Sequence, residues 1–328
     1  MEETTNNNDT LEKQPLVSII VITYNSSKYV LETLESAKAQ TYQNIELIVS
    51  DDCSTDNTVE ICREWIEKNK ERFVRTELIT AEKNTGIPAN CNRGVKAAQG
   101  EWVKLIAGDD ILDKKCIENN IVYVLKNTSA EIIFSQVLLF QDEIKNSKNS
   151  IIYPLADETN FFYYDACDQY KNLLTRNFVW SAPSSFIKTD IIKRLLLFNE
   201  KYKCIEDYPF WLKATKNNIK LYFYPLITAY YRQAPSMRRN YDKWINSEYF
   251  ISLREFYEDE IKKHLKEINY KKYLEWNIYF YKYSVLLQVF GNKKDFFSRS
   301  FNKLFTLTSP CLIKILNVTE KFKNLIIF

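Results

Sequence analysis

The amino-acid sequence predicts an α/β protein: a Rossmann-like wound, mostly parallel sheet with flanking helices, followed by a C-terminal helical region. Four short apolar runs between residues 16 and 107 alternate with three stretches of helical periodicity. This alternation is typical of parallel strands joined by helical crossovers. From about residue 241 the periodicity is helical to the end. The hydrophobic fraction of 45% supports a sizeable core and excludes wholesale disorder.

The first half of the predicted sheet consists of four strands and the three helices between them. The run Val-Ser-Ile-Ile-Val-Ile-Thr within residues 16–24 is largely β-branched, as expected of a strand buried on both faces. Pro88 is placed near the first turn of a helix, where proline is common. The predicted strands are residues 16–24, 45–50, 74–80 and 101–107, and the predicted helices are residues 28–40, 58–70 and 88–98.

The second half is predicted to be less regular. Residues 141–150 are polar and are predicted to form a surface loop, and residues 151–180 are predicted to be irregular. The aromatic run Phe161-Phe162-Tyr163-Tyr164 is interpreted as core, with stacking on a sugar ring as the alternative. The predicted helices are residues 114–126, 189–197 and 208–216, and the predicted strands are residues 131–140, 220–224 and 227–232.

The chain is predicted to divide into a disordered lead-in (1–14), an α/β domain (15–240, with halves 15–126 and 127–240) and a helical, basic region (241–328). Residues 271–328 carry ten Lys and Arg against three Asp and Glu, a balance of 10 − 3 = +7 within a total of +3. A basic tail on a mildly acidic body suggests an anionic partner, such as a phospholipid surface or nucleic acid. Ordinary solvated helices are the alternative.

The cysteines and the histidine exclude several kinds of site. Seven cysteines are widely spaced without a C-x-x-C pair, which argues against a zinc site or a disulfide framework and favours buried thiols in a reducing cytosol. His264 is the only histidine, so a histidine-based triad is not expected. We expect no signal peptide, because residues 1–14 are polar and lack a basic n-region and an apolar h-region. We expect no transmembrane helix, because no apolar run approaches about 18 residues.

Polar residues follow the predicted strands where each strand ends. They are Thr23-Tyr24-Asn25, Asp51-Asp52, Asn84–Gly86 and Asp109-Asp110. Because ligands bind beyond the carboxyl ends of the strands in wound sheets, we expect these residues to form a site. Adjacent carboxylates after a buried strand predict a divalent cation, with an Asp-rich turn as the alternative. Four of the five glycines lie within the 23 residues that end near this pair, which favours a site.

Residues 15–126 resemble the inverting family 2 glycosyltransferases of the GT-A fold, which build bacterial surface polysaccharides, and a weaker resemblance reaches about residue 235. The matching motifs stand in the expected order. They are Val-Ser-Ile-Ile-Val-Ile-Thr-Tyr-Asn, Asp51-Asp52-Cys53-Ser54-Thr55-Asp56, Asn84-Thr85-Gly86, Ala89-Asn90, Asn92-Arg93-Gly94, Gly100-Glu101-Trp102 and Asp109-Asp110. The family usually has glycine at the position of Cys53, and many members have an acid at the position of Ala107.

The resemblance implies roles for these residues. Asp52 is expected to accept a hydrogen bond from a uracil N–H, and the Tyr24 ring to lie beside the base. Asp109 and Asp110 are expected to contact the ribose and to bind Mg²⁺ or Mn²⁺ against the diphosphate, with Asp110 as the first choice for the direct metal ligand. The other residues assigned to the nucleotide-sugar site are Thr23, Asn25, Asn84, Gly86, Asn90 and Arg93.

The pair Glu206-Asp207 resembles the family's Glu-Asp motif, whose Asp is the catalytic base. Asp207 is therefore the predicted base, because an inverting transfer needs a carboxylate that takes the proton of the acceptor hydroxyl. A helix N-cap is the alternative. Relatives often have Tyr-Arg followed by His where Tyr231-Arg232-Gln233 stands here, so the resemblance implies that Arg232, Arg238 and Arg239 lie near the diphosphate. The Gln-x-x-Arg-Trp motif of processive synthases is absent, which favours a single-addition enzyme.

The resulting hypothesis is a non-processive, metal-dependent glycosyltransferase that uses a nucleotide sugar, UDP-linked by preference, and a glycan acceptor that is lipid-linked. We expect it to be cytoplasmic and peripheral on the inner face of the membrane, with no nucleic-acid partner. The alternatives are a nucleotidyltransferase acting on sugar phosphates, disfavoured because Thr23–Ser27 has neither Gly nor Lys, and a non-catalytic partner subunit.

The end of the chain is predicted to contact the membrane. Its apolar residues fall on one helical face and its lysines lie on the polar side, as in a helix that lies in the interface. The apolar residues are Cys311, Ile315, Val318, Phe322 and Leu325, and the lysines are Lys314, Lys321 and Lys323. A terminal helix packed on a domain is the alternative.

Overall fold

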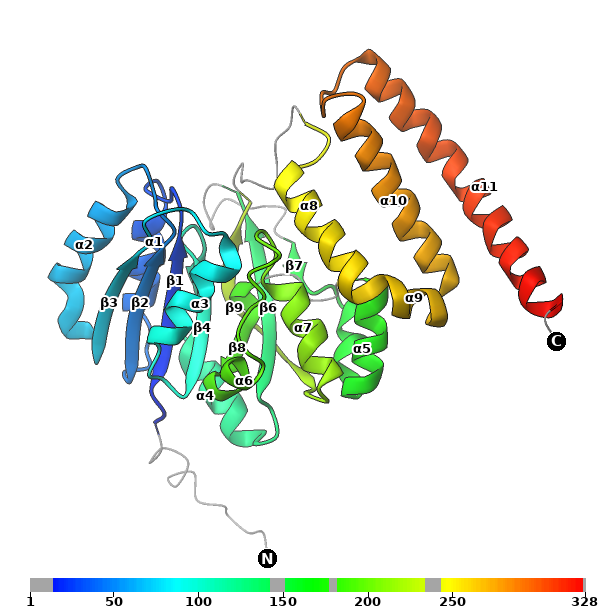
Figure 1. The fold of residues 1–328 in the computed structure, drawn as a ribbon. Coiled ribbons are helices and arrows are strands. Elements are labelled where there is room, and N and C mark those ends of the chain that lie inside the picture. The colour runs from blue at the N-terminus through cyan, green and yellow to red at the C-terminus, as the bar shows by residue number, and fades with distance from the viewer. Residues whose placement is uncertain (1–13, 142–150, 177–181, 234–242, 327–328) are drawn as a thin grey trace, which may run out of the picture. The chain divides into compact units, whose positions relative to one another are not determined.

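A computed structural model describes residues 14–141, 151–176, 182–233 and 243–326 of the 328-residue chain (Figure 1). Its internal contacts divide the chain into two compact units. The first consists of Met1–Tyr170, Asn177–Glu200 and Glu206–Ala234, and the second of Lys171–Arg176, Lys201–Ile205 and Pro235–Phe328. Most of the predicted lead-in and polar loop, and the predicted boundary near residue 240, lie outside the described residues.

The first unit is built on one mixed sheet with the strand order β3-β2-β1-β4-β8-β6-β9-β5, and β7 pairs with β6. Its parallel part confirms the predicted first half. It consists of β1 (Val17–Thr23), β2 (Ile45–Asp51), β3 (Arg75–Thr80) and β4 (Trp102–Ala107). Every residue of β2 is buried, including the polar Glu46, Ser50 and Asp51, as expected of a strand covered on both faces.

The helices of this half also lie where they are predicted, with ends that differ by one or two residues. They are α1 (Val30–Lys38), α2 (Thr58–Asn69) and α3 (Ile87–Ala97), and a 3-10 turn, η1 (Lys70–Arg72), follows α2. Val17, Ile19 and Val21 of β1 belong to a buried cluster that also contains apolar residues of α1, α2 and α4 (Cys116–Lys126). The alternate residue Ile20 faces α3, so closely that a Cβ at Gly94 would meet its Cγ2 at 2.3 Å.

The rest of the sheet is antiparallel except for one pair. β6 (Ile132–Phe140) runs parallel to β9 (Leu221–Arg232) and antiparallel to β7 (Ile152–Tyr153) and β8 (Ser185–Lys188). β5 (Ile111–Leu112) pairs with the end of β9, and β8 also pairs with β4. The short strands β5, β7 and β8 were not predicted.

The prediction of two strands at residues 220–224 and 227–232 is wrong, because both belong to β9. Tyr224 pairs with Ser135 and Ile227 with Gln136, so the two residues between them are left out of the register. One of them is Pro225, which cannot donate a ladder hydrogen bond and is tolerated at a bulge. The bulge lets one strand pass a proline that the sequence marks as a break.

Residues 151–180 contain more structure than predicted. They include a 3-10 segment, η3 (Glu158–Tyr163), and α5 (Ala166–Thr175), so the irregular prediction is wrong there. Periodicity misses α5 because its polar first half offers few apolar positions. Phe161 and Phe162 are buried, and the Phe162 ring stacks on Phe223 with centroids 5.0 Å apart, which confirms the core interpretation for these two rings. Tyr163 is 80% exposed.

Two helices of the first unit flank the segment before the candidate base, Asp207. η4 (Ala182–Ser184) precedes β8, which continues into α6 (Thr189–Arg194), and α7 (Asp207–Lys216) follows. α6 ends three residues before its predicted end, where Leu196 and Leu197 adopt left-handed φ values of 60° and 66°. α7 is confirmed, and it begins at the candidate base itself.

The second unit is helical, as predicted. It contains α8 (Ser247–Phe256), a π-helical turn, η5 (Tyr257–Ile261), and α9 (Lys262–Ile268), α10 (Tyr270–Gln288) and α11 (Phe296–Ile326). The Trp276 ring stacks on those of Tyr257 and Phe280, each with centroids 5.5 Å away, which joins η5 to α10. Within the described ranges, no helix has both the length and the apolar character needed to cross a bilayer.

Candidate active site

The sheet register brings the predicted strand ends to one level. Thr23, the last residue of β1, pairs with Asp51 of β2, and Ile22 pairs with Ala107 of β4. The chain then turns at the same edge, since Asp52 N–H donates to Thr23 O at 3.0 Å and Gly108 N–H donates to Ile22 O at 2.9 Å. The residues that follow β1, β2 and β4 therefore lie at one edge, as the sequence predicts.

The two adjacent aspartates after β2 have different environments. Asp51 is fully buried and accepts hydrogen bonds from Thr23 Oγ1 at 2.7 Å and from Ser54 N–H at 2.8 Å. Asn25, in a left-handed conformation with φ of 51°, accepts from Thr55 N–H at 2.8 Å. Asp51 and Asn25 thus join the turn after β1 to the turn after β2. The side chain of Asp52 points instead toward the start of α3.

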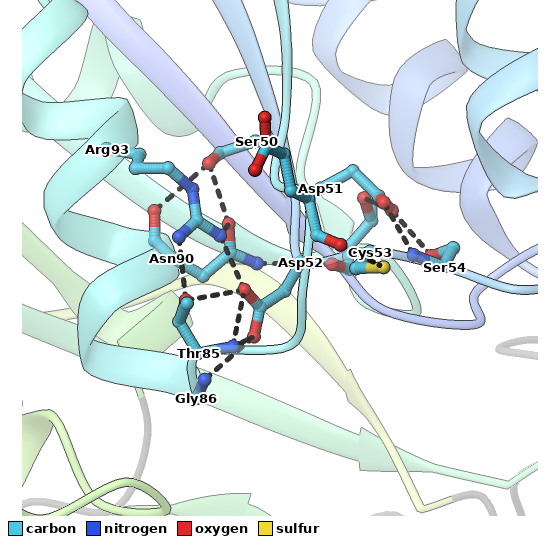
Figure 2. A network of polar contacts seen from close by, with 11 residues as sticks. Ser50, Asp51, Asp52, Cys53, Ser54, Thr85, Gly86, Asn90 and Arg93 are labelled. Atoms are coloured by element: carbon cyan, nitrogen blue, oxygen red, sulfur yellow. Dashed lines mark hydrogen bonds and ion pairs between the residues drawn. The ribbon is translucent and has the colours of Figure 1, made fainter.

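Asp52 is the centre of a hydrogen-bond network with the start of α3 (Figure 2). Its carboxylate accepts from Thr85 Oγ1 at 2.7 Å, from Gly86 N–H at 2.8 Å and from Thr85 N–H at 3.0 Å. Arg93 adds an ion pair, with Nη2 2.6 Å from Asp52 Oδ1. These four donors match the roughly four lone-pair positions of one carboxylate, so the uracil N–H predicted to bind Asp52 would have to compete with them.

Arg93 and Asn90 complete the network from α3. Arg93 Nη1 donates to Thr85 Oγ1 at 2.7 Å, and its Nη2 donates to Asn90 Oδ1 at 3.1 Å. Asn90 Oδ1 also accepts from Ser50 Oγ at 2.6 Å, while its amide donates to Thr23 O at 3.1 Å. The structure thus joins Thr23, Asp52, Gly86, Asn90 and Arg93, all predicted site residues, in one cluster. Thr85 is an addition that the sequence hypothesis left unassigned.

Tyr24 and Asn84 lie at the rim of this cluster. Tyr24 follows the last residue of β1 and is 36% exposed, and Asn84, one residue before Thr85, is also exposed. The Tyr24 ring is thus accessible to a ligand, and its contact with a base stays a prediction.

The second aspartate pair follows β4 through Gly108, where the chain passes so close to β1 that a Cβ would meet Thr23 Cγ2 at 2.8 Å. Asp109 is half-buried and Asp110 is 1% exposed. Asp110 Oδ1 accepts the backbone N–H of Arg232 at 2.9 Å. Its Oδ2 is buried and has no hydrogen-bond partner among the described residues. A carboxylate oxygen in that condition is costly unless a cation or a donor reaches it.

Arg232 connects the pair to α1 and β9. Its Nε donates to Asp109 O at 2.9 Å, and its Nη2 lies 2.6 Å from Glu32 Oε2 on α1. The guanidinium also lies 4.3 Å from the Tyr29 ring centroid and 4.5 Å from that of Phe140. Its side chain is 1% exposed, so Arg232 is buried beneath the aspartate pair that it contacts. Contact of Arg232 with a diphosphate stays a prediction, and Arg238 and Arg239 lie outside the described residues.

The electrostatics of the pair favour a cation. Burial raises the pKa of Asp109. Burial and then the charge of Asp109 raise the pKa of Asp110 well above its ordinary value, while Arg232 acts in the opposite direction. The half-buried Asp109 and the buried Asp110 share one neighbouring guanidinium, and a divalent ion between them would favour the ionised form of both carboxyls.

The candidate base, Asp207, is the first residue of α7 and is 7% exposed. Its Oδ1 accepts the N–H of Tyr208 at 2.7 Å, and the N-cap position belongs to Glu206. The N-cap alternative for Asp207 is therefore wrong. Burial, with the charges of Glu206 and Asp207, raises the pKa of the Cys91 thiol on α3 well above its ordinary value. Glu206 and Asp207 therefore lie within electrostatic range of Cys91, on the helix that carries Asn90 and Arg93.

A single amide ties α3 to the segment that leads to the base. Asn92 Nδ2 donates to Phe198 O at 2.9 Å and to Glu200 Oε1 at 2.8 Å, and Phe198 N–H donates back to Asn92 Oδ1 at 2.9 Å. Asn92 is 2% exposed, so this contact is internal. No role for Asn92 was predicted from the sequence. Its position three residues after Ala89, on the same side of helix α3, was the one pattern that could have indicated that it is buried.

Comparison with known proteins agrees with this geometry. Residues 18–190 match the model of glycosyl transferase family 2. An uncharacterized glycosyltransferase of Methanocaldococcus jannaschii is 30% identical over 84% of this chain and 89% of its own length. The chain belongs to glycosyl transferase family 2.

This family 2 chain also resembles a structurally known relative. Staphylococcus aureus TarS, a poly(ribitol-phosphate) β-N-acetylglucosaminyltransferase, is 29% identical over 61% of this chain, a match that covers 32% of TarS. The structure of TarS residues 1–349 with UDP-GlcNAc superposes with a TM-score of 0.58 at 21% identity, over 87% of this chain and 78% of the other. The predicted GT-A fold, a wound and mostly parallel sheet with flanking helices and a helical C-terminal region, is thereby confirmed.

The residues of this family 2 chain fit a divalent metal ion at Asp109 and Asp110. The fit rests on the buried Asp110 Oδ2, which lacks a partner in the described part of the chain. That part contains no group of three or more His, Cys, Asp or Glu side chains able to hold a metal. A pair of carboxylates is nevertheless compatible with Mg²⁺, which commonly takes one or two carboxylates and completes its shell with water and substrate phosphates.

Proposed function

We propose that this family 2 glycosyltransferase is an inverting, non-processive enzyme that transfers a sugar from a UDP-sugar to a hydroxyl of a lipid-linked glycan acceptor during surface polysaccharide synthesis. The observation that carries the proposal is that two acidic sites belong to different elements of the first unit. Asp109 and Asp110 follow β4, whereas Asp207 begins α7 beside α3. One acidic site can then hold the leaving group while the other takes the proton of the acceptor.

The donor half of the reaction depends on the edge at Thr23, Asp52 and Gly86. Asp52 would accept a hydrogen bond from the uracil N–H in exchange for one of its present donors, and the Tyr24 ring would pack beside the base. Asp109 and Asp110 would hold Mg²⁺ or Mn²⁺, which supplies positive charge for the departing diphosphate. The UDP-GlcNAc that TarS binds supports a UDP-linked donor.

The acceptor half depends on Asp207. Its carboxylate would remove the proton of the acceptor hydroxyl as that oxygen attacks the anomeric carbon from the face opposite the diphosphate. Asp207 is 7% exposed, so little water would compete with the acceptor hydroxyl for its carboxylate. The basic second unit would hold the enzyme at the inner face of the membrane, where lipid-linked acceptors are found.

Two variants of the full chain separate the roles of these aspartates. Asp207→Asn should retain Mn²⁺-dependent binding of UDP and lose transfer by about 100-fold or more. Asp110→Ala should lose the Mn²⁺-dependent binding itself. UDP binding is measured by the rise in thermal midpoint with UDP and Mn²⁺, and transfer by UDP release from a panel of UDP-sugars with lipid-linked saccharides.

Asp190→Asn is the matched control, because Asp190 also lies in the first turn of a helix but is exposed. It should leave binding and transfer unchanged. Full turnover of Asp207→Asn would show that the base lies elsewhere. A rise in thermal midpoint with GDP or CDP, and none with UDP, would show that the assignment of a UDP-linked donor is wrong.

A further inference from the structure

The last helix, α11, presents two different apolar faces. Phe301 and Phe305 are half-buried and face α10 and the turn after it, with ring centroids 5.4 Å from Phe290 and 6.0 Å from Tyr281 respectively. Away from these contacts lies a second set, the outer stripe, which is exposed to solvent. It consists of Phe297, Leu304, Leu307, Cys311 and Ile315, of which the four larger residues are 61–71% exposed.

The outer stripe is continuous along the helix. Its members are seven, three, four and four residues apart, and this spacing keeps them within about 80° of one face at 100° per residue. From Phe297 to Ile315 the stripe extends about 27 Å at 1.5 Å per residue. Pro310 lies inside the helix without ending it, and Ser309 Oγ donates to Thr306 O at 3.4 Å, the carbonyl that the proline leaves without its usual partner. An exposed apolar band of this length differs from the single, scattered apolar residues that protein surfaces commonly expose.

Cations border the outer stripe on one side. Arg299, Lys303 and Lys314 are exposed, and none of them forms an ion pair with a described residue. The sequence from residue 296 to residue 319 contains no Asp or Glu. An apolar band flanked by unbalanced positive charge is complementary to an anionic lipid surface, in which acyl chains and phosphates lie at adjacent depths. A second copy of the same face would instead bring like charges together.

We propose that α11 lies along the surface of an anionic membrane, with the outer stripe buried at the boundary of the acyl chains and with Arg299, Lys303 and Lys314 among the lipid phosphates. The inference rests on the membrane-peripheral part of the proposed function and gives it a specific surface. It extends the interfacial segment predicted at residues 311–328 toward the start of α11.

Vesicle co-sedimentation of the full chain tests the proposal. The probe is phosphatidylcholine vesicles with about 30% phosphatidylglycerol, compared with phosphatidylcholine alone. Leu304→Gln/Leu307→Gln should reduce partitioning onto the anionic vesicles by about tenfold. Val122→Gln/Leu196→Gln replaces two exposed apolar residues of the first unit, 44% and 80% exposed, and should partition as the wild type does.

A fluorescent label locates the contact. An environment-sensitive dye on Cys311 should shift to the blue when anionic vesicles are added, whereas the same dye on Cys167, which is exposed on α5, should not. Mn²⁺-dependent UDP binding should be equal in all these variants, so that a failure of membrane docking is distinguishable from a failure of the proposed chemistry.

Two results would overturn the proposal. The first is partitioning that is equal for the wild type and the Leu304→Gln/Leu307→Gln variant. The second is a wild-type dimer in light scattering that becomes a monomer in this variant while neither protein binds vesicles, because the outer stripe would then be covered by a second copy.

Discussion

The backbone N–H of Arg232 donates to Oδ1 of Asp110 at 2.9 Å, which joins the last residue of β9 to the residue that follows the turn after β4. The side chain of the same arginine holds Asp109 O. Arg232 therefore fixes both members of the aspartate pair, one through its carboxylate and one through its backbone. This arrangement makes the arginine a positioning residue for the proposed metal site.

Arg232→Lys should weaken Mn²⁺-dependent UDP binding by about tenfold or more and lower the thermal midpoint. Lysine keeps the charge but cannot reach Asp109 O and Glu32 together, and it loses the planar contacts with Tyr29 and Phe140. Mn²⁺ binding is measured by electron paramagnetic resonance of the free ion in the presence of UDP.

Arg72→Lys is the matched control. Arg72, in the turn η1, also donates to several backbone carbonyls, those of Lys38, Gln40 and Tyr42, but it donates to no predicted site residue within the described ranges. It should lower the thermal midpoint without changing Mn²⁺ or UDP affinity. If both variants lower the midpoint and neither changes the affinity, Arg232 is structural only.

Gly86→Ala should destabilise the protein by about 1–3 kcal/mol and weaken UDP binding. Gly86 has φ of 95° and ψ of 165°, a region that is nearly restricted to glycine, and its N–H donates to Asp52. Gly291→Ala is the control, since Gly291 has φ of 57° and its Cβ would meet nothing within 4 Å. It should cost about 1 kcal/mol and leave UDP binding intact. Urea unfolding and calorimetric titration with UDP measure the two effects.

Cys53→Gly should stabilise the protein by about 1 kcal/mol. Cys53 has φ of 67°, and a left-handed conformation costs about 1–2 kcal/mol in a residue that carries a Cβ. Cys311→Gly, in the interior of α11, should instead cost about 1 kcal/mol. Equal losses of unfolding free energy in the two variants would show that Cys53 is not strained.

Asp56→Asn should lower the free energy of unfolding at about pH 7 by about 0.5 kcal/mol or less, because solvent screens this partly exposed carboxylate, and the difference should vanish in acid. Burial alone would raise the pKa of Asp56, but hydrogen bonds from Ser27 and Thr58 outweigh it and hold the pKa below its ordinary value of 3.8. The contribution of Asp56 is therefore present above pH 3.8 and is lost as the pH falls through the lower folded pKa. A difference that stays constant in urea unfolding down to about pH 3 would contradict this assignment.

The sequence predicts the parallel half of the fold well because its signals are local. The β-branched runs of β1 and β2 and the periodic helices between the strands specify a wound sheet without reference to the rest of the chain. Elements that depend on partners are missed. β8 forms because β4 and β6 lie on either side of it, and β9 continues past Pro225 because a bulge accommodates the proline.

The site shows the same division. Order along the chain predicts that Asp52, Gly86 and Arg93 belong together, and the structure joins them through hydrogen bonds and an ion pair to Asp52. Their pairing leaves Asp52 with a full set of donors, which a motif cannot reveal. The contact between Arg232 and Asp110 spans 122 residues, and no local pattern carries information over that distance.

Asn92 sets a practical limit on recombining this enzyme. Because its amide exchanges hydrogen bonds with Phe198 and reaches Glu200, helix α3 and the approach to Asp207 are matched to each other. A chimera that joins the donor half of this chain to the acceptor half of a relative inherits the contact only if both sides come from one parent or are redesigned together. The useful crossover points are therefore those that keep residues 87–97 and 198–207 in the same fragment.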